Sequence, residues 1–154
     1  MEEENEKKYL DRLALRVLIY LVTFSVVALF AGYALLGRGD RLTMAVAIAL
    51  MGISGSGVAA LTSCLNRYAN GFELENGKRV PDQAVGETFN RRMALWFIFR
   101  PFLGLIVAPV FVWGIETRYI SSSDKLGFWG FVGGLLAKSV IDLIKGLFKS
   151  IFKV

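Results

Sequence analysis

The sequence predicts an all-α integral membrane protein: four antiparallel transmembrane helices, a C-terminal basic amphipathic helix and a small cytoplasmic β-hairpin. Two observations point to this fold class. Four apolar stretches each approach the ~20 residues that a helix needs to cross a ~30 Å hydrocarbon core, and lysines and arginines are unevenly shared between the connecting segments. A chain of 154 residues leaves no room for a separate soluble domain beside four spans, so we expect one domain, residues 1–154.

The predicted spans cover residues 13–36, 42–65, 94–115 and 126–144. Apolar residues make up 55% of the chain and the mean hydropathy is +0.51, which favours a chain that crosses a membrane several times. The turn-forming run Gly37-Arg38-Gly39-Asp40 predicts that the first two spans pair as a helical hairpin.

Basic residues gather on one side of the predicted membrane. That side holds Lys7, Lys8, Arg12, Arg16, Arg67, Lys78, Arg79, Arg91, Arg92, Lys138, Lys145, Lys149 and Lys153. The other side holds Arg38, Arg41, Arg118 and Lys125. The positive-inside rule places the richer side in the cytoplasm, which predicts cytoplasmic N and C termini in a bacterial inner membrane. The net charge of +5 therefore reflects topology beside an anionic leaflet and does not indicate nucleic-acid binding.

Small side chains crowd the second span and recur at the start of the fourth. Lipid tails are as apolar as leucine, so transmembrane helices associate where small residues let their backbones approach closely. The residues predicted to pack helices share small-x3-small spacing: Gly52, Gly55, Ser56, Ala59, Gly130 and Gly134. We therefore expect the second span to lie at the centre of the bundle.

The cytoplasmic connection, residues 66–93, contains a predicted β-hairpin at residues 71–81. Phe72 and Leu74 alternate with acidic residues, and Asn76-Gly77 suits a type I′ turn, whose two central residues take positive φ. Because a lone hairpin is marginally stable in water, we expect it to rest on the bundle, on a second subunit or on a partner.

The third predicted span contains two prolines, Pro101 and Pro109. Proline lacks an N–H, so a transmembrane helix accommodates it only where neighbouring groups satisfy the freed carbonyls. The two prolines predict a kinked third span.

Three ionisable residues are predicted in the inner half of the membrane: Arg100, Lys138 and Asp142. At ~1.5 Å per residue, they lie at similar depths, so Arg100 and Asp142 are a candidate pair, buried or lining a pore. A central arginine or lysine costs about 2.5–3.5 kcal/mol on insertion scales, which favours a polar partner. The alternative is that both long basic side chains snorkel to the inner headgroups.

Residues 138–154 form a predicted basic amphipathic helix that continues the fourth span. Apolar residues recur on one side and lysines on the other. The candidates for binding anionic lipid or a partner are Lys145, Lys149 and Lys153. Such a helix is suited to lie on an anionic membrane surface or to protrude into the cytoplasm.

No catalytic or metal site is expected. The chain has no histidine, the commonest general base and a frequent metal ligand. Cys64 is the single cysteine, which excludes an internal disulfide and a cysteine-based metal site. The residues around Ser54 break the G-x-S-x-G pattern, and no Gly-Lys-Ser/Thr follows the glycines. We therefore expect a non-enzymatic protein without a cofactor.

Two classes of function fit these features. The first is a homo-oligomeric pore or channel-type subunit, including a membrane-permeabilising effector, in which a stripe of glycines, lysines and Asp142 from Gly130 to Lys153 lines a shared axis. The alternative is a non-conducting anchor or accessory subunit, which recruits a cytoplasmic protein or anionic lipid through residues 66–93 and the basic tail. A small secondary transporter is disfavoured because the two halves show no clear repeat.

Overall fold

A computed structural model describes residues 2–36, 38, 40–81, 86–119 and 123–152. This part of the chain is mostly helical, with a two-stranded hairpin. Its elements are α1 Glu2–Leu36, α2 Arg41–Asn70, β1 Phe72–Glu73, β2 Arg79–Val80, α3 Arg91–Phe99, α4 Pro101–Tyr119 and α5 Ser123–Phe152. Within the described residues, four helical stretches are long and apolar enough to cross a membrane: Glu3–Leu36, Arg41–Asn70, Arg91–Ile115 and Lys125–Leu143. Each of these four stretches overlaps one predicted span.

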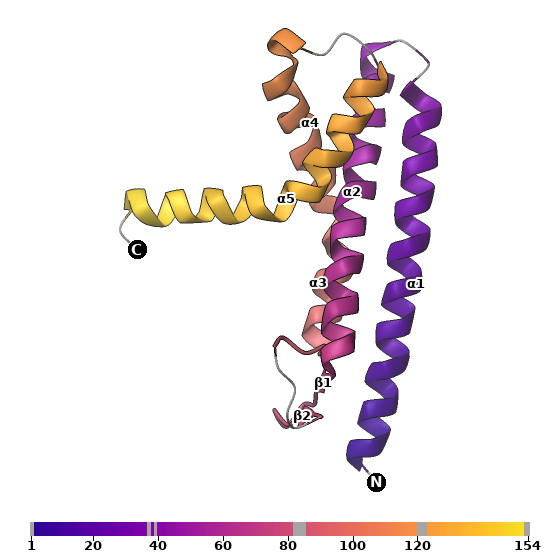
Figure 1. Ribbon diagram of the computed structural model, residues 1–154, viewed down its shortest axis with the longest axis vertical. Coiled ribbons are helices and arrows are strands. Elements are labelled where there is room, and N and C mark those ends of the chain that lie inside the picture. Colours follow the sequence, from indigo (N-terminus) through magenta and orange to yellow (C-terminus); the bar gives the residue numbers. More distant parts are fainter. Residues whose placement is uncertain (1, 37, 39, 82–85, 120–122, 153–154) are drawn as a thin grey trace.

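The first two helices lie side by side over most of their length (Figure 1). α1 runs without interruption from Glu2, so the charged N-terminal residues extend the same helix as the first apolar stretch. α2 begins at Arg41 after Asp40, whose carboxylate accepts a hydrogen bond from the Thr43 N–H at 2.8 Å. This cap satisfies a donor that would otherwise be free at the start of the helix.

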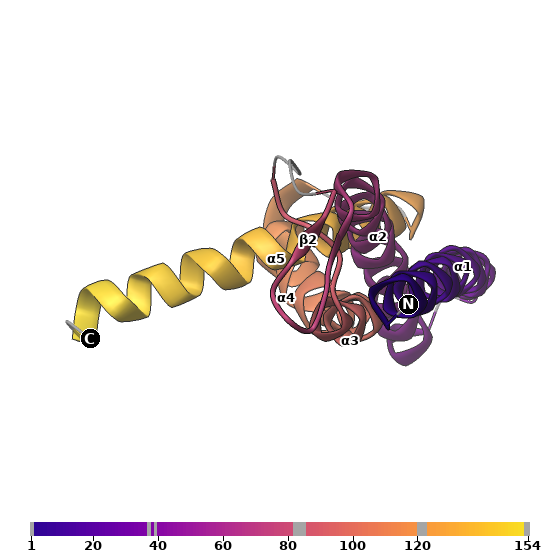
Figure 2. The same ribbon diagram turned by 90° about the horizontal axis from the view of Figure 1, so that it is seen from below.

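α2 lies at the centre of the bundle, as its small residues predict. It packs against α1, α4 and α5, and its buried residues fall mainly between Ala47 and Ala60. Seen from below in Figure 2, α1 lies on one side of α2 and α4 with α5 on the other. The helix that can be approached most closely therefore has the most neighbours.

The third apolar stretch consists of two helices. α3 ends at Phe99, Arg100 forms a turn, and α4 begins at Pro101. Proline cannot donate to the helical hydrogen-bond ladder and its ring crowds the preceding turn, so the interruption coincides with the first predicted kink. Pro109 lies inside α4, which continues through it.

The predicted hairpin is present, and β1 is its central strand. β1 pairs antiparallel with β2, placing Phe72 opposite Val80. On the other edge of β1, the Glu73 N–H donates to the Phe89 carbonyl at 3.0 Å, and the Phe89 N–H donates to the Gly71 carbonyl at 2.9 Å. Residues 71–81 and 86–90 therefore form one small structure, which we call the hairpin unit.

The turn of the hairpin differs from the predicted type I′ turn. The Gly77 N–H donates to the Leu74 carbonyl at 2.9 Å, and the Leu74 N–H donates to the Lys78 carbonyl at 2.9 Å. The turn therefore spans residues 74–77, and Gly77, with φ of +81°, is the bulge that closes it. The prediction is wrong by one residue in register because Glu75 and Asn76, not Asn76 and Gly77, occupy the central positions.

The hairpin unit rests on the bundle, the first of the three predicted supports. Buried aromatic rings join it to α3, with centroids 6.3 and 6.4 Å apart along the series Phe72, Phe89 and Phe97. At α1, the Glu75 N–H donates to the Glu6 carboxylate at 2.6 Å, and Lys78 pairs with Glu3 at 2.9 Å. The unit is thus fixed to two helices.

α5 follows the bundle at first and then turns away from it (Figure 1). Gly134 and Ala137 are buried, whereas Lys138, Asp142 and Lys145 are exposed, so the helix leaves the bundle after Ala137. We call the part from Lys138 to Phe152 the arm. Figures 1 and 2 show the arm running across the long direction of the bundle, away from α1.

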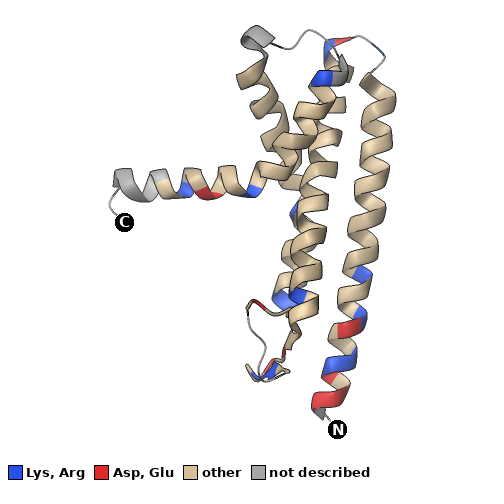
Figure 3. Cartoon of the chain, in the orientation of Figure 1, with Lys and Arg blue, Asp and Glu red and all other residues tan. Residues whose placement is uncertain are grey.

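Charged residues gather in two main places (Figure 3). One is the end formed by the start of α1 and the hairpin unit, and the other is the arm; a few more mark the connection near Asp40. The surface between is apolar, with exposed side chains that include Leu15, Ile19, Phe30, Leu95 and Ile106. An exposed apolar belt of this kind suits contact with lipid chains.

Candidate functional site

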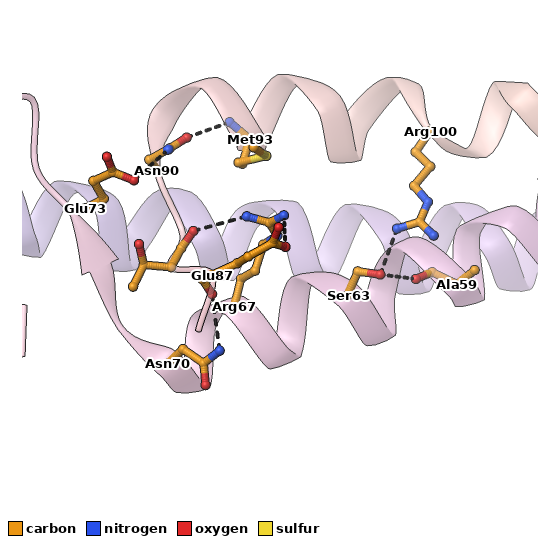
Figure 4. A network of polar contacts seen from close by, with 10 residues as sticks. Ala59, Ser63, Arg67, Asn70, Glu73, Glu87, Asn90, Met93 and Arg100 are labelled. Carbon is orange, nitrogen blue, oxygen red and sulfur yellow. Dashed lines mark hydrogen bonds and ion pairs between the residues drawn. The ribbon is translucent and has the colours of Figure 1, made fainter. Parts of the chain in front are cut away.

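Arg100 is buried at the α3–α4 junction, with 6% of its surface exposed. Figure 4 shows its side chain reaching to α2, where Nη1 donates to Ser63 Oγ at 2.8 Å. Ser63 Oγ in turn donates to the Ala59 carbonyl at 2.9 Å. The buried Nε of Arg100 has no hydrogen-bond partner in the described part of the chain. A buried donor left unpaired costs about 1–3 kcal/mol, so the guanidinium is only partly satisfied.

Side chains from α1 and α2 bind the backbone around Pro101. Ser56 Oγ donates to the Arg100 carbonyl at 2.8 Å, and the Tyr20 hydroxyl donates to the Ile98 carbonyl at 3.3 Å. Proline removes one donor from the helical ladder, and neighbouring helices can add bonds at such a place. The Arg100 carbonyl also accepts from the Leu103 N–H at 3.0 Å. Ser56, predicted as a small packing residue, therefore also supplies a hydrogen bond that fixes Arg100 against α2.

A polar face continues along the last turns of α2 toward the hairpin unit. Arg67 forms an ion pair with Glu87 and donates from Nη1 to the Thr88 carbonyl at 3.4 Å. Asn70 Nδ2 donates to the Glu87 carbonyl at 3.2 Å, and Figure 4 shows these contacts in a row. The sequence did not predict these residues as part of a site. Their spacing of four and three residues nevertheless places Ser63, Arg67 and Asn70 on one helix face.

A cavity of about 200 Å³ opens beside Arg100. The polar face of α2 lines one side of it, and Lys138 lines it from the start of the arm. Trp96 and Phe97 of α3 add apolar surface. Three basic side chains line this space, Arg67, Arg100 and Lys138, whereas Glu87 is the one acidic residue among the described residues of the lining. We therefore call it the cationic cavity.

The structure places Lys138 in the same cavity lining as Arg100, and it shows no ion pair between Arg100 and Asp142. No contact within 4.0 Å joins Arg100 to a carboxylate among the residues that the structure describes. Arg100 is thus enclosed among polar groups, while Lys138 and Asp142 are exposed.

Several of the predicted packing residues lie where helices cross within the chain. Three helices meet where Gly52 of α2 faces Gly104 of α4 and Gly134 of α5, because a side chain at any of these glycines would overlap the backbone of another. At neighbouring positions of α2 and α5 lie Gly55, Ser56, Ala59 and Gly130. The bundle interior is therefore closely packed around Gly52.

The lysines predicted to bind lipid or a partner belong to the arm and its end. Lys145 is exposed. Lys149 lies in α5 with its side chain outside the described part, and Lys153 lies outside the described residues. Lys138, Asp142 and Lys145 share one helix face by their spacing. Since Lys138 lines the cationic cavity, this polar face is directed toward the end of the bundle that holds the hairpin unit.

The arrangement offers hydrogen-bond donors and positive charge more than catalytic groups. Within the described residues, no group of three or more His, Cys, Asp and Glu side chains could hold a metal ion. Cys64 is buried in an apolar cluster with Leu21 and Phe97, so packing accounts for it. The chain matches no known protein family, no curated protein sequence and no solved structure, so its function must be argued from the site itself.

Proposed function

We propose that this chain is a non-conducting membrane anchor. Its four apolar stretches cross the membrane in alternating directions, the hairpin unit faces the cytoplasm to hold a partner protein, and the arm lies along the inner membrane surface. The observation that carries this proposal is the arm, an amphipathic helix that leaves the bundle across its long direction (Figure 1). Helices with one basic and one broad apolar face are those that lie in a membrane interface.

The two faces of the arm support this placement. Lys138 lines the cationic cavity together with Asn70 and Glu87, beside the hairpin unit. The polar face is therefore directed toward the end that we assign to the cytoplasm. Leu143 is 65% exposed and lies on the other side of the helix from Lys145. That side is directed toward the hydrocarbon.

The depth of the arm also fits an interfacial helix. Lys138 is thirteen residues from Lys125, or about 20 Å along α5 at ~1.5 Å per residue. A ~30 Å hydrocarbon core leaves about 10 Å to its inner boundary, and interfacial helices insert about 5–10 Å into that boundary. Lysine side chains on the polar face would span the remaining distance by snorkelling.

The hairpin unit supports an anchoring role. β1 is paired on both edges, and the unit contacts α1 and α3 through buried rings and ion pairs. Its exposed surface is therefore held in one orientation, as is usual for loops that bind partners. The close packing at Gly52 also favours anchoring over conduction through a single chain.

A pair of fluorescent probes tests the placement of the arm. In a Cys64→Ala background, an environment-sensitive fluorophore is attached to Leu143→Cys or to Lys145→Cys. Both positions are exposed and they lie on opposite faces of the arm. In liposomes containing anionic lipid, we expect lipid-borne quenchers to reach the first probe and aqueous iodide to reach the second. Equal quenching of both probes by iodide contradicts an interfacial arm.

The hairpin unit is tested by replacing residues 72–80 with a flexible linker in the full chain. We expect the proteins that copurify with the wild-type chain from native membranes to be lost. Retention of the same proteins would remove the hairpin unit as the recruiting surface.

A homo-oligomeric pore is the second candidate, favoured by the exposed charges Lys138, Asp142 and Lys145 on the arm. Copies arranged around an axis would line it with this face, whose basic character favours anions. The test is conductance of the purified protein in planar bilayers, with anion preference reduced or reversed in Lys138→Glu. Absence of conductance, or conductance indifferent to this charge reversal, would falsify the pore.

A further inference from the structure

Arg100 has donors that the protein leaves unused. A guanidinium offers five N–H groups, and the described residues accept a hydrogen bond from one of them, at Ser63 Oγ. Nε is buried without a partner. The described part of the chain therefore leaves this buried cation in need of further acceptors.

The charges around the cationic cavity favour an anion. Arg67 is already paired with Glu87, whereas Arg100 and Lys138 form no ion pair with any described residue. The cavity thus keeps two cations whose charge is not directly neutralised, with one carboxylate nearby.

The size and lining of the cavity suit a small oxyanion. Its volume of about 200 Å³ corresponds to about six or seven water molecules at ~30 Å³ each, enough for a phosphate group and a few waters. Ser63, Asn66 and Asn70 add neutral polar groups to the lining. An oxyanion placed there would meet donors from three separate segments of the chain.

We propose that the cationic cavity binds a phosphate group, with Arg100 and Lys138 as its ligands. A planar guanidinium matches two oxygens of a phosphate, and a lysine adds a flexible point charge. The phosphate supplies the acceptors that Arg100 lacks. Two hydrogen bonds hold Arg100 in place: its side chain donates to Ser63, and its carbonyl accepts from Ser56. The guanidinium is therefore already positioned before a phosphate binds.

Phosphate of this kind has two sources, the headgroup of an anionic phospholipid and a soluble phosphate compound. Trp96 lines the cavity and is 40% exposed on α3, which suits the lipid source because tryptophan favours the membrane interface. The lipid source rests on the membrane placement proposed above. The phosphate site itself does not depend on that placement.

The test uses the purified full chain in neutral detergent and in phosphatidylcholine nanodiscs. The probes are inorganic phosphate and phosphatidylglycerol, added at constant ionic strength. Binding is read from Trp96 fluorescence in a Trp113→Phe, Trp129→Phe background and from the shift in unfolding temperature. The matched variants are Lys138→Gln and Lys125→Gln, two exposed lysines of α5, of which only the first lines the cavity.

We expect saturable binding of at least one probe, weakened about tenfold in Lys138→Gln through the loss of one charge-assisted contact. Lys125→Gln should change the affinity by less than about twofold, as for an ordinary surface charge. Arg100→Lys should also weaken binding, because the charge remains but the two-pronged geometry is lost.

The source follows from which probe binds. Saturation by phosphatidylglycerol alone assigns a lipid headgroup. Saturation by inorganic phosphate in detergent, where no bilayer places the arm, supports the site even if the anchor proposal fails. Lack of saturable binding of both probes, or equal weakening by the two lysine variants, overturns the site.

Discussion

Along α2, the contacts with neighbouring helices change in kind between Gly52 and Asn70. Around Gly52 the backbones of α2, α4 and α5 approach so closely that a side chain would overlap Gly104 or Gly134. Toward Asn70, hydrogen bonds and an ion pair are added to apolar contacts such as those of Cys64. These polar contacts are made by Ser56 and the polar face that follows it.

The difference follows from the groups that the helices beside α2 present to it. Beside Gly52, α4 and α5 present Gly104 and Gly134, which let the backbones come into contact, so shape complementarity holds these helices together. Beside Ser56, the neighbouring helix is interrupted at Pro101, and the Arg100 carbonyl accepts from Ser56 as well as from the Leu103 N–H. One helix therefore packs by shape around Gly52 and adds hydrogen bonds where its partner is interrupted at Pro101.

The largest effect is expected at the polar end, for Phe89→Ala. Phe89 is fully buried and stacks on Phe97 with ring centroids 6.4 Å apart. Removing a buried phenylalanine costs about 3–5 kcal/mol, which should release the hairpin unit while the apolar bundle remains. Hydrogen exchange at the Glu73 amide, which is bonded to the Phe89 carbonyl, should accelerate strongly.

The control is Phe99→Ala on the same helix as Phe97. Phe99 is 64% exposed, so its removal should leave exchange in the hairpin unit unchanged. Equal acceleration in both variants would show that the aromatic series does not hold the unit in place.

The next largest effect is expected at the packed crossing, for Gly52→Leu. A leucine there must displace the backbone of Gly104 and the methyl group of Ala108. Overpacking costs about 1–3 kcal/mol, and more where backbone must move. The unfolding temperature in detergent should fall, whereas Gly114→Leu, where an added Cβ meets open space, should not lower it. A tolerated Gly52→Leu would mean that the helices are not held by close approach.

A smaller effect is expected at the boundary between the two regions, for Ser56→Ala. The change removes the hydrogen bond to the Arg100 carbonyl, worth about 0.5–1.5 kcal/mol. Thr62→Ala is the matched control because its hydroxyl bonds back to its own helix at Val58 and is exposed. Chemical denaturation should separate the two variants, and identical midpoints would argue against a role for Ser56 at the proline break.

The smallest effect is expected at Asp40, outside both regions. Hydrogen bonds from Thr43 lower the pKa of Asp40 below its ordinary value. A lowered folded-state pKa stabilises the protein above the unfolded pKa of about 4, and this contribution is lost as pH falls through the folded value. Asp40→Asn keeps a capping side chain and should remove that part of the pH dependence. Thermal unfolding of both forms from pH 7 to pH 3 measures the difference, and superimposable curves would exclude it.

Structural features that depend on residues close together in the sequence were predictable. Runs of apolar residues predict the helical stretches, and Pro101 predicts the interruption of the third. The hairpin is predictable from alternation around Asn76-Gly77, but its turn register is not, because the burial of Phe72 and Leu74 against the bundle also selects the pairing. The exposed charges of the arm follow from helical spacing alone.

The candidate site was predictable only in part. Arg100, Lys138 and Asp142 stand out because charge is rare in apolar stretches. Ser63, Arg67 and Asn70 do not stand out, because polar residues near the end of a span are ordinary. Their importance depends on facing Arg100 and Glu87, which are far from them in the sequence.

By itself the sequence determined the four apolar helical stretches, the gathering of charge at one end and on the arm, and the position of the break at Pro101. These features depend on residue types that lie close together in the chain. Only the tertiary structure decided that Arg100 donates to Ser63, that Lys138 lines a cavity beside Arg100, and that α5 leaves the bundle after Ala137. Those outcomes depend on how distant helices pack, and the close contacts of Gly52, Gly104 and Gly134 set that packing.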